Sequence, residues 1–406
     1  GHVRRGRPTR RAVPRVSAPA VELGPPPRIF YAILVTVAMF VLLGLVMVLS
    51  ASSATAVDGS AYAVFSKQAA WAALGTVVAI VVVKVPYHIW RTMAIPIAVL
   101  ASGAMLLPFM PGIGATVNDA TSWVRVGGLS FQPSEFLKLA AIGFLADYFA
   151  RHEHEGHDRR HGMIPMALTA AMCAGVAAVQ GDLGSAIVLA AIVLAVGVVA
   201  GVPLVHVASV SLVGAIGATA MIVSDPRRMH RLIAFRDIQG NRQDLAYQSW
   251  QGLVSIANGG ITGSGVGGSN SKLGYLPLAH SDFIFAVVAD ELGLVGSIAV
   301  IGGFMLLVWF GVQAALAAPD RFGMLLAGGI AAWFGVQAIV NLGGVAGLMP
   351  VTGLTLPFFS AGGTSLFVSI IAAALLLNVS RRAVTVARAD RTRSVPRPRR
   401  VRSALA

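Results

Sequence analysis

The sequence has little charge and almost no cysteine. Charged residues make up 12% of its 406 residues, 56% are apolar, and the mean hydropathy is +0.76. A soluble domain carries roughly twice this share of charge, so the composition excludes an ordinary soluble protein. The one cysteine, Cys173, lies within an apolar run. A single cysteine excludes a disulfide within the chain and a cysteine-based metal site.

Long apolar runs are abundant, and many approach the roughly 20 residues that a helix needs to cross a bilayer. The alternation of apolar and polar residues that marks a membrane β-barrel is missing. We therefore expect an all-α polytopic membrane protein with ten transmembrane helices. The predicted spans are residues 29–52, 66–85, 92–110, 132–150, 163–180, 184–201, 205–224, 282–312, 323–345 and 361–380.

The net charge of +14 gathers in two arginine-rich tails, residues 1–28 and 381–406, on either side of a transmembrane domain at 29–380. Neither tail has interleaved aromatics or a known module, so we expect no nucleic-acid partner. We expect the first tail to be disordered. Most of the 31 basic residues lie on the side of the tails. The positive-inside rule then places both termini in the cytoplasm.

This topology makes residues 111–131 and 225–281 extracytoplasmic loops. The second, between spans 7 and 8, is long and basic, against the positive-inside rule. An anionic substrate outside the membrane would explain that charge. On the cytoplasmic side, the segment Arg151–His161 contains four histidines. Its mixed charge and irregular spacing match no standard metal site, so we expect a solvated loop and assign no metal ligands.

The stretch from Gly274 to Gly293 carries the sharpest chemical signal. It changes from a polar loop to an apolar run at Asp282, which places this carboxylate where a span meets water. Asp290 and Glu291 lie roughly 12–14 Å deeper in a helix, where acids should face the protein interior. They point about 100° apart. We interpret them as buried structural partners, with direct chemistry as the alternative, and a helix cap remains the alternative for Asp282.

Two further segments contain polar groups beside apolar runs. Pro133 suits the first turn of a helix, on which Glu135 and Lys138 share a face. They form either a simple ion pair or, with Arg125, a cavity wall that holds phosphate oxygens. Asp182 follows a glycine break and either caps the next helix or faces a cavity.

The long loop and the C-terminal region each hold an irregular, glycine-rich segment. Residues 258–270 lack the preceding strand and the Gly-Lys-Ser/Thr of a phosphate-binding P-loop, whereas residues 245–257 predict an amphipathic interfacial helix. Residues 341–365 contain enough glycine and proline to break a helix at membrane depth, which is tolerated where the backbone lines a cavity. Transporters also contain broken helices, so this pattern fits an enzyme or a carrier.

Together these segments resemble the SEDS family of shape, elongation, division and sporulation proteins, over residues 30–380. The resemblance is carried by Gln132-Pro-Ser-Glu-Phe-Leu-Lys138, Gly181-Asp-Leu-Gly184, Tyr247-Gln248, Ala279-His-Ser-Asp-Phe283 and Leu348–Ser365. Val48–Ser53 and the Gly-Gly-Thr-Ser ending are more similar to division members, whereas Ala289–Gly293 is closer to some elongation members. The chain departs from the family pattern at Asp119 and Gly181.

The resemblance implies a peptidoglycan glycosyltransferase that polymerises lipid II, an undecaprenyl-pyrophosphate disaccharide-peptide, in the bacterial plasma membrane at the division septum. The family's essential acid falls on Asp282, which we expect to act as general base. It also implies a class B penicillin-binding protein of the FtsI type and other division proteins as partners. The residues expected to bind substrate are Arg125, Lys138, Glu135, Gln132, Arg231, Lys272, His280 and Ser365.

No cofactor is firmly indicated, although Mg²⁺ or Mn²⁺ could assist the pyrophosphate. Three other functions remain open: an elongation polymerase of the same family, a lipid II flippase, and a scaffold that only recruits the penicillin-binding protein. A flippase would use its buried acids for substrate or ion passage.

Overall fold

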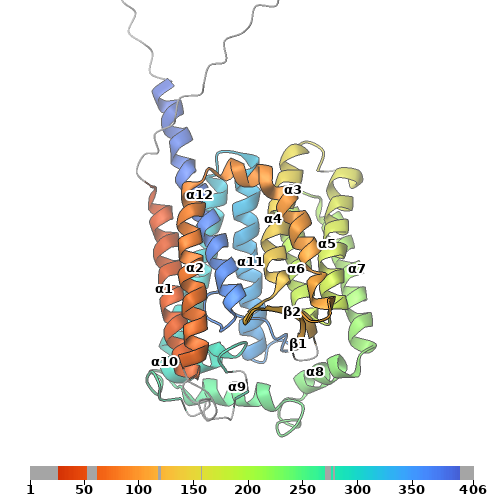
Figure 1. The fold of residues 1–406 in the computed structure, drawn as a ribbon, viewed down its shortest axis with the longest axis vertical. Coiled ribbons are helices and arrows are strands. Elements are labelled where there is room, and N and C mark those ends of the chain that lie inside the picture. The colour runs from red at the N-terminus through yellow and green to blue at the C-terminus, as the bar shows by residue number, and fades with distance from the viewer. Residues whose placement is uncertain are drawn as a thin grey trace, which may run out of the picture.

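The computed structural model describes residues 26–52, 62–117, 120–156, 158–269, 276–277 and 279–393. These residues form a bundle of long helices, with a small sheet and two short helices at one end (Figure 1). The long helices are α1 Arg28–Ser52, α2 Tyr62–Lys84, α3 Tyr87–Ala104, α4 Pro133–Arg151, α5 Ile164–Val179, α6 Leu183–Val199, α7 Leu204–Val223, α10 Ile284–Leu316, α11 Arg321–Val345 and α12 Gly363–Arg393.

Every predicted apolar run coincides with one of these helices. Eight of them are long and apolar enough to cross a membrane. The other two differ in composition or length: α4 includes the charged Glu135, Lys138 and Asp147, and α6 has only 17 residues. The chain is a multi-pass membrane protein. The helix α12 continues beyond the predicted end at residue 380 as far as Arg393.

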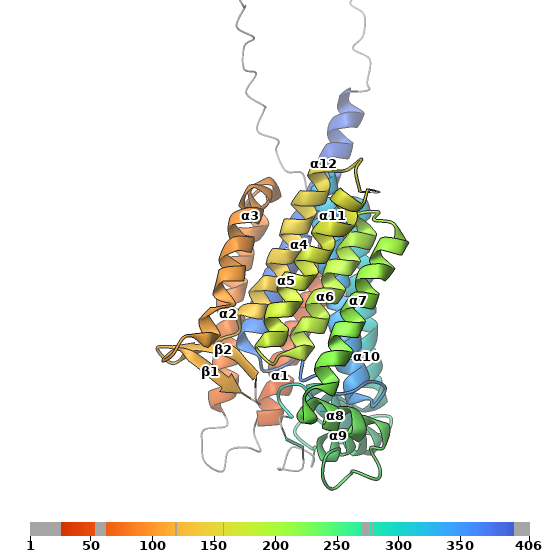
Figure 2. The ribbon, with the colours of Figure 1, turned by 90° about the vertical axis from the view of Figure 1, so that its right-hand side faces the viewer.

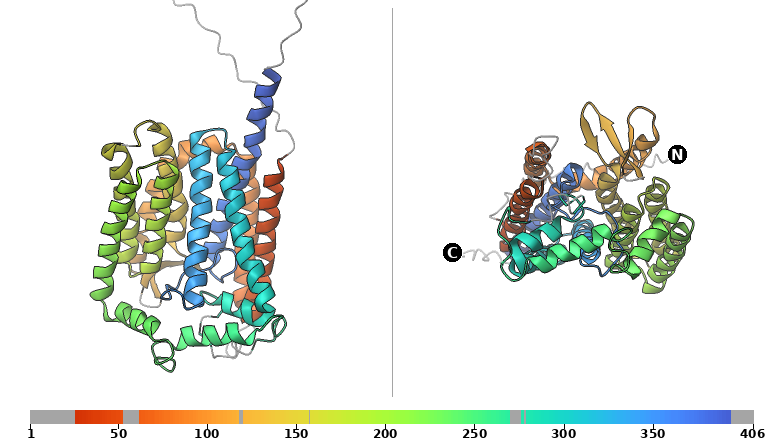
Figure 3. Two further views of the ribbon diagram at one scale, coloured as in Figure 1. Left: turned by 180° about the vertical axis from the view of Figure 1, so that it is seen from behind. Right: turned by 90° about the horizontal axis from the view of Figure 1, so that it is seen from below.

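The two ends of the bundle differ. Helix α1 begins and α12 ends on the same side (Figure 1). On the opposite side, α8 Pro226–Arg236 and α9 Tyr247–Asn258 lie across the bundle (Figure 3). Helix α9 confirms the helix predicted at 245–257. Helix α8 was not predicted. It begins where Asp225 caps Arg227 N–H at 3.0 Å and Pro226 occupies the first turn.

The prediction of an all-α chain with a loop at 111–131 was wrong in one place. After the 3₁₀ turn η1 Leu107–Phe109, this segment forms an antiparallel sheet in the order β1-β2-β3. The strands are β1 Gly114–Val117, β2 Ala120–Val126 and β3 Leu129–Phe131. Gly127 and Gly128 adopt φ of 56° and 82° between β2 and β3, a tight hairpin turn that glycine permits. Figure 2 shows the sheet beside the lower end of the bundle.

The interior of the bundle is built around α11 and α12. Helix α11 packs against α4, α6 and α10, and α12 packs along α2. Trp333 and Phe334 of α11 are fully buried, whereas α7 has no buried residue. The enclosed helices also bury Lys138, Glu135 and Gln337. A buried cation and carboxylate are costly in apolar surroundings unless they are paired, so these side chains mark a polar centre within the bundle.

Helix α10 is broken at Gly293, where φ is 66° and ψ is −161°. The predicted span at 282–312 therefore is not one uninterrupted helix. Loop 259–265 supplies the missing backbone partners: Ser264 N–H donates to Asp290 O at 2.9 Å, and Leu294 N–H donates to Gly260 O at 2.9 Å. The loop satisfies backbone groups that a broken helix would otherwise leave unpaired at membrane depth.

Candidate active site

Asp282 lies in a turn just before α10. The helix begins at Ile284 with Phe283 at its N-cap position, so Asp282 is not the N-cap. Its side chain is buried, and Oδ1 has no hydrogen-bond partner within the described part of the chain. Burial raises the pKa of Asp282 from 3.8 to about 6, against the opposing effects of its own backbone and the positive charge of Arg231.

The segment around Asp282 is fixed from two sides. Asn341 of α11 donates through Nδ2 to Asp282 O at 2.9 Å and to Leu354 O at 2.7 Å. Ala361 N–H donates to His280 O at 2.8 Å. Burial lowers the pKa of His280 from 6.5, which favours the neutral imidazole at pH 7. The glycine- and proline-rich segment after α11 therefore holds Asp282 in place.

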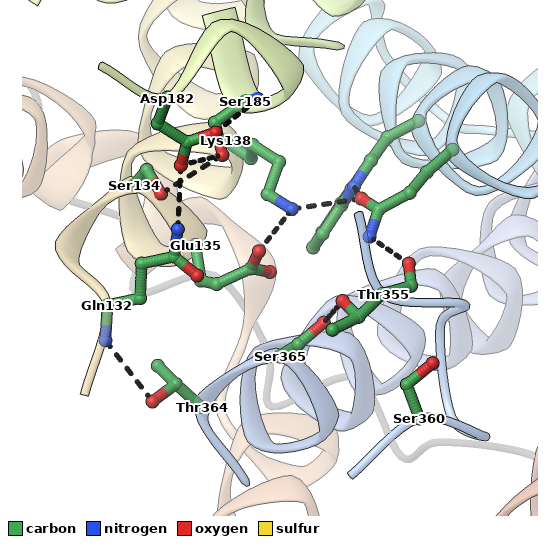
Figure 4. Close-up of polar contacts among 12 residues, drawn as sticks. Gln132, Ser134, Glu135, Lys138, Asp182, Ser185, Thr355, Ser360, Thr364 and Ser365 are labelled. Atoms are coloured by element: carbon green, nitrogen blue, oxygen red, sulfur yellow. Dashed lines mark hydrogen bonds and ion pairs between the residues drawn. The ribbon is translucent and has the colours of Figure 1, made fainter. Parts of the chain in front are cut away.

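A buried network lies where α4 meets α11 (Figure 4). Lys138 is fully buried, and its Nζ donates to Glu135 Oε1 at 2.7 Å and to Gln337 Oε1 at 2.9 Å. Gln337 in turn donates through Nε2 to Thr355 O at 2.8 Å. The Trp333 N–H also donates to Gln337 Oε1 at 2.6 Å. The predicted Glu135–Lys138 pair exists, but as part of an interior network and not on a solvated helix face.

The network has unused hydrogen-bonding capacity. A lysine ammonium has three N–H donors, and two of those of Lys138 are occupied by Glu135 and Gln337. Glu135 Oε2 is buried and has no partner among the described residues. Because unpaired buried carboxylate oxygens are costly, Glu135 Oε2 and Asp282 Oδ1 are the two groups best placed to gain from an incoming hydroxyl.

A second polar chain joins the first turn of α4 to α6 and α12 (Figure 4). Asp182 caps α6 by accepting Ser185 N–H at 2.9 Å, and it also accepts Gln132 Nε2–H at 2.8 Å. Asp182 therefore caps α6 and is also a member of the polar chain. Gln132 N–H donates to Thr364 Oγ1 at 3.4 Å, and the neighbouring Ser365 accepts from Thr355 Oγ1 at 2.8 Å.

The remaining predicted binding residues lie elsewhere. Arg125 is exposed on β2 and Arg231 is exposed on α8, and neither forms an ion pair with any residue that the structure describes. Arg231 is nonetheless close enough to act electrostatically on Asp282. Lys272 lies outside the described residues. The predicted set thus divides into a buried polar group and an exposed basic rim.

The deeper acids are tied to serines. Ser50 of α1 donates to both carboxylate oxygens of Glu291, at 2.6 and 2.8 Å. Ser269 donates to Asp290 Oδ2. Both acids are buried, Glu291 completely. These contacts support the interpretation of Asp290 and Glu291 as structural partners.

Sequence reasoning missed the role of Gln337 and did not single out Asn341 beyond its segment. These amides are four residues apart on α11 and therefore share one face. Two polar side chains at this spacing in an apolar span mark a face directed into the protein. That signal was available, but their partners on α4 and before α10 were not visible in the sequence.

The geometry suits proton transfer on an anionic, hydroxyl-rich substrate. A carboxylate whose pKa is near 6 can accept a proton near neutral pH. Amide and hydroxyl groups line the buried centre (Figure 4), and the positive charge of Arg231 acts on Asp282. This set provides a base, orienting groups and positive charge for an anion.

An apolar groove on the side of the bundle extends to the first turn of α4, where the buried polar network begins. Its volume is about 340 Å³. It is lined from α2, α3, α4, α11 and α12, and it includes Pro133 and Phe136 on either side of Ser134 and Glu135. An apolar chain in this groove would end beside the buried polar network.

Comparisons with known proteins identify the family. The family model for FtsW, RodA and SpoVE, described as "Cell cycle protein", matches residues 31–385. Over 343 residues the chain is 36% identical to "Probable peptidoglycan glycosyltransferase FtsW" of Geobacter sp. (strain M18), covering 84% of this chain and 93% of the relative. It is also 36% identical to "Stage V sporulation protein E" of Bacillus subtilis (strain 168) over 349 residues, covering 84% and 93%.

A solved structure agrees with the sequence relatives. One chain of a peptidoglycan synthase complex, studied for the coordination of polymerization and crosslinking, superposes with a TM-score of 0.72 and 28% identity. The match covers 87% of this chain and 98% of that chain. This chain therefore belongs to the FtsW/RodA/SpoVE family of cell cycle proteins, in which relatives are named as peptidoglycan glycosyltransferases.

Proposed function

We propose that this chain is a peptidoglycan glycosyltransferase that polymerises lipid II into β-1,4 glycan strands, with Asp282 as the general base. The observation that carries the assignment is the buried carboxylate of Asp282, with one unpartnered oxygen and a pKa raised to about 6. A positioned base whose pKa lies near the working pH contributes about 10²–10⁴ in rate.

In the proposed reaction, the 4-hydroxyl oxygen of the acceptor sugar attacks the anomeric carbon of the donor. The bond between that carbon and the pyrophosphate oxygen breaks, with inversion at the carbon. Asp282 takes the hydroxyl proton, and the lipid pyrophosphate leaves with the bonding electron pair. Glu135 Oε2, which lacks a partner among the described residues, would accept from a sugar hydroxyl and orient it.

Positive charge near the site would stabilise the departing pyrophosphate. Arg231 and Arg125 are exposed and unpaired among the described residues, so their donors are available to phosphate oxygens. Lys138 is held by Glu135 and Gln337. Its role is to shape the polar wall and to offer its third N–H inward. Gln132, His280, Ser365 and Lys272 complete the proposed substrate-binding set.

A divalent cation fits this site only in a limited way. No group of three carboxylate, histidine or cysteine side chains converges beside Asp282 among the described residues. Mg²⁺ commonly uses one or two carboxylates together with substrate phosphates, and Asp282 Oδ1, which has no partner among the described residues, would be one such ligand. A bound Mg²⁺ or Mn²⁺ would neutralise charge on the leaving pyrophosphate.

The apolar groove is the proposed binding site of the lipid tail. We propose ten spans with both tails in the cytoplasm, so that Asp282, α8, α9 and the sheet face the outside of the plasma membrane. The isoprenoid tail would lie in the groove between α3 and α4. The pyrophosphate would then meet the polar network at the start of α4.

The proposed partner is a class B penicillin-binding protein of the FtsI type, acting with other division proteins at the septum. Support comes from the division-protein names of relatives and from the likeness to one chain of a peptidoglycan synthase complex. An elongation polymerase of the same family and a lipid II flippase are the alternatives. The site favours a polymerase over a flippase because it offers an unpartnered base.

The test is lipid II polymerisation by the purified chain with its penicillin-binding protein partner. The wild type should yield glycan ladders, and Asp282→Asn should lose about 10²–10⁴ in rate while it stays folded and bound to its partner. Asp244→Asn, an exposed acid of the same long segment, serves as the matched control. Equal ladders from Asp282→Asn would remove it from the chemistry. Absent ladders from the wild type, with lipid II translocation in liposomes, would favour the flippase.

A further inference from the structure

The loop between α4 and α5 gathers side chains that the proposed function does not use. It lies at the end of the bundle where α1 begins and α12 ends, away from Asp282 (Figure 1). His152, Glu155 and His161 each offer one ligand atom here, and these atoms lie within 4.8 Å of one another. No other such group of three occurs among the described residues.

The two imidazoles are held face to face. The rings of His152 and His161 stack with centroids 5.2 Å apart and planes at 17°, and Tyr148 stacks on His152 at 4.5 Å. His152 Nδ1 lies 2.9 Å from Tyr148 O. A carbonyl oxygen only accepts, so Nδ1 carries a proton, and in the neutral imidazole Nε2 then offers the lone pair. A histidine that donates one ring N–H to a backbone carbonyl and turns the other nitrogen outward is the usual arrangement at a metal ion.

Two carboxylates flank His161. Its Nδ1 lies 3.3 Å from Glu155 Oε2 and 3.6 Å from Asp158 Oδ2. Both acids are more than half exposed. They can therefore move by the small distance needed to reach metal-ligand bond lengths of roughly 2.0–2.2 Å. Two imidazoles and one carboxylate thus supply three convergent ligands, and Asp158 lies beside them, 3.6 Å from His161 Nδ1.

The loop backbone is closed into a compact shape. Glu155 N–H donates to His152 O at 3.0 Å, and Gly162 N–H donates to Asp158 O at 2.8 Å. Gly156 O lies so close to Gly162 that a side chain at Gly162 would place Cβ 2.2 Å from it. The bend that brings His161 back over His152 therefore depends on glycine at position 162.

The loop carries charges of both signs. Arg151 is paired with Asp147 at 2.8 Å, and Arg321 faces Glu153 at 4.0 Å. These two arginines are paired with other acids, whereas Arg159 and Arg160 are exposed beside Asp158. The carboxylates of Glu155 and Asp158 face His161.

We propose that His152, Glu155 and His161, with Asp158 as a fourth ligand, form a binding site for a divalent transition-metal ion, best fitted by Zn²⁺. Imidazole and carboxylate ligands select Zn²⁺ over Mg²⁺ and Ca²⁺, which prefer oxygen donors alone. The ion would tie the end of α4 to the π-helical turn η2 Arg159–Met163 that opens α5.

The experiment uses the full chain in detergent, without a histidine tag and freed of metal by a chelator, titrated with ZnCl₂. Wild type should bind one Zn²⁺ per chain at micromolar or lower concentration and gain thermal stability. His152→Ala, His161→Ala and the surface variant Glu155→Gln should each weaken binding by about tenfold or more. His154→Ala alters an exposed histidine of the same loop and should bind as wild type.

X-ray absorption at the zinc edge should show nitrogen and oxygen neighbours at about 2.0–2.2 Å. Three results would overturn the site: no saturable binding by the wild type, binding that survives His152→Ala together with His161→Ala, or equal loss from His154→Ala. Glu155→Gln guards against misfolding, because its side chain is half exposed and its replacement leaves the stacked rings in place.

Discussion

The three acids of the segment from Asp282 to Glu291 differ in what surrounds them. All three are buried. The single Ser50 hydroxyl lies within hydrogen-bond distance of both carboxylate oxygens of Glu291, and the Ser269 hydroxyl donates to Asp290 Oδ2. Asp282 has an oxygen without a partner among the described residues, and burial raises its pKa. Burial alone therefore does not distinguish a reactive acid from a structural one.

The difference follows from position along the chain. Asp282 lies in the turn before α10. Asp290 and Glu291 lie at the break of α10, where loop 259–265 and α1 close over them. A carboxylate left short of hydrogen bonds is unfavourable for folding but available for chemistry. Four predictions test this contrast, from the largest expected effect to the smallest.

The first prediction compares turnover after neutralisation of each acid. Asp282→Asn should lower the polymerisation rate by about 10²–10⁴. Asp290→Asn should retain turnover within about tenfold, because the Asp290 carboxylate is hydrogen-bonded to the Ser269 hydroxyl. Steady-state glycan synthesis measures both. Equal losses from the two variants would break the contrast.

The second prediction concerns the closure around the deeper acids. Gly293→Ala should destabilise the protein by about 2–4 kcal/mol, because Cβ would lie 2.4 Å from Gly263 N and φ is 66°. Gly302→Ala lies in the same helix with open space around it and is the control. Thermal unfolding in detergent measures the difference. A Gly293→Ala protein as stable as the Gly302→Ala protein would show that the break in α10 does not depend on glycine at position 293.

The third prediction is that Asp282→Asn and Ser50→Ala change the free energy of unfolding in opposite directions. The folded pKa of Asp282 is raised from 3.8 to about 6, so its contribution to stability is present at low pH and lost as pH rises through about 6. Asp282→Asn removes this penalty and should stabilise the protein at pH 8 by up to about 3 kcal/mol.

Ser50→Ala provides the opposite case. It removes the Ser50 hydroxyl donor from buried Glu291 and should destabilise the protein by about 1–3 kcal/mol. Unfolding midpoints at pH 5 and pH 8 measure both variants. A destabilised Asp282→Asn would assign Asp282 a structural role.

The fourth prediction concerns the acid limb of the pH–rate profile. A general base must be deprotonated, so turnover should fall below about pH 6. Arg231 lowers the pKa of Asp282. Arg231→Gln should therefore move the limb to higher pH by a fraction of a unit, and less at high salt. Arg236→Gln, exposed on the same helix, is the control. An unmoved limb would remove Arg231 from the electrostatics of the base.

The sequence predicted what depends on length and local composition. All ten apolar runs became helices, and Asp282 was identified from its place at the start of one. The hairpin at β1–β3 was not predicted, because its strands are short and irregular beside the strong apolar runs. The role of Gln337 was hidden for another reason. Its partner Lys138 is 199 residues away in the chain, and an isolated sequence does not show that α4 and α11 meet.

The break in α10 has a consequence for how the protein enters the membrane. The carbonyls of Asp290 and Glu291 find their partners on loop 259–265, which precedes the helix in the chain. Until that loop docks, a newly inserted α10 would hold unpaired backbone groups in lipid, which is costly. Return of the preceding loop to α10 is therefore the step that completes the backbone pairing of this helix in the membrane.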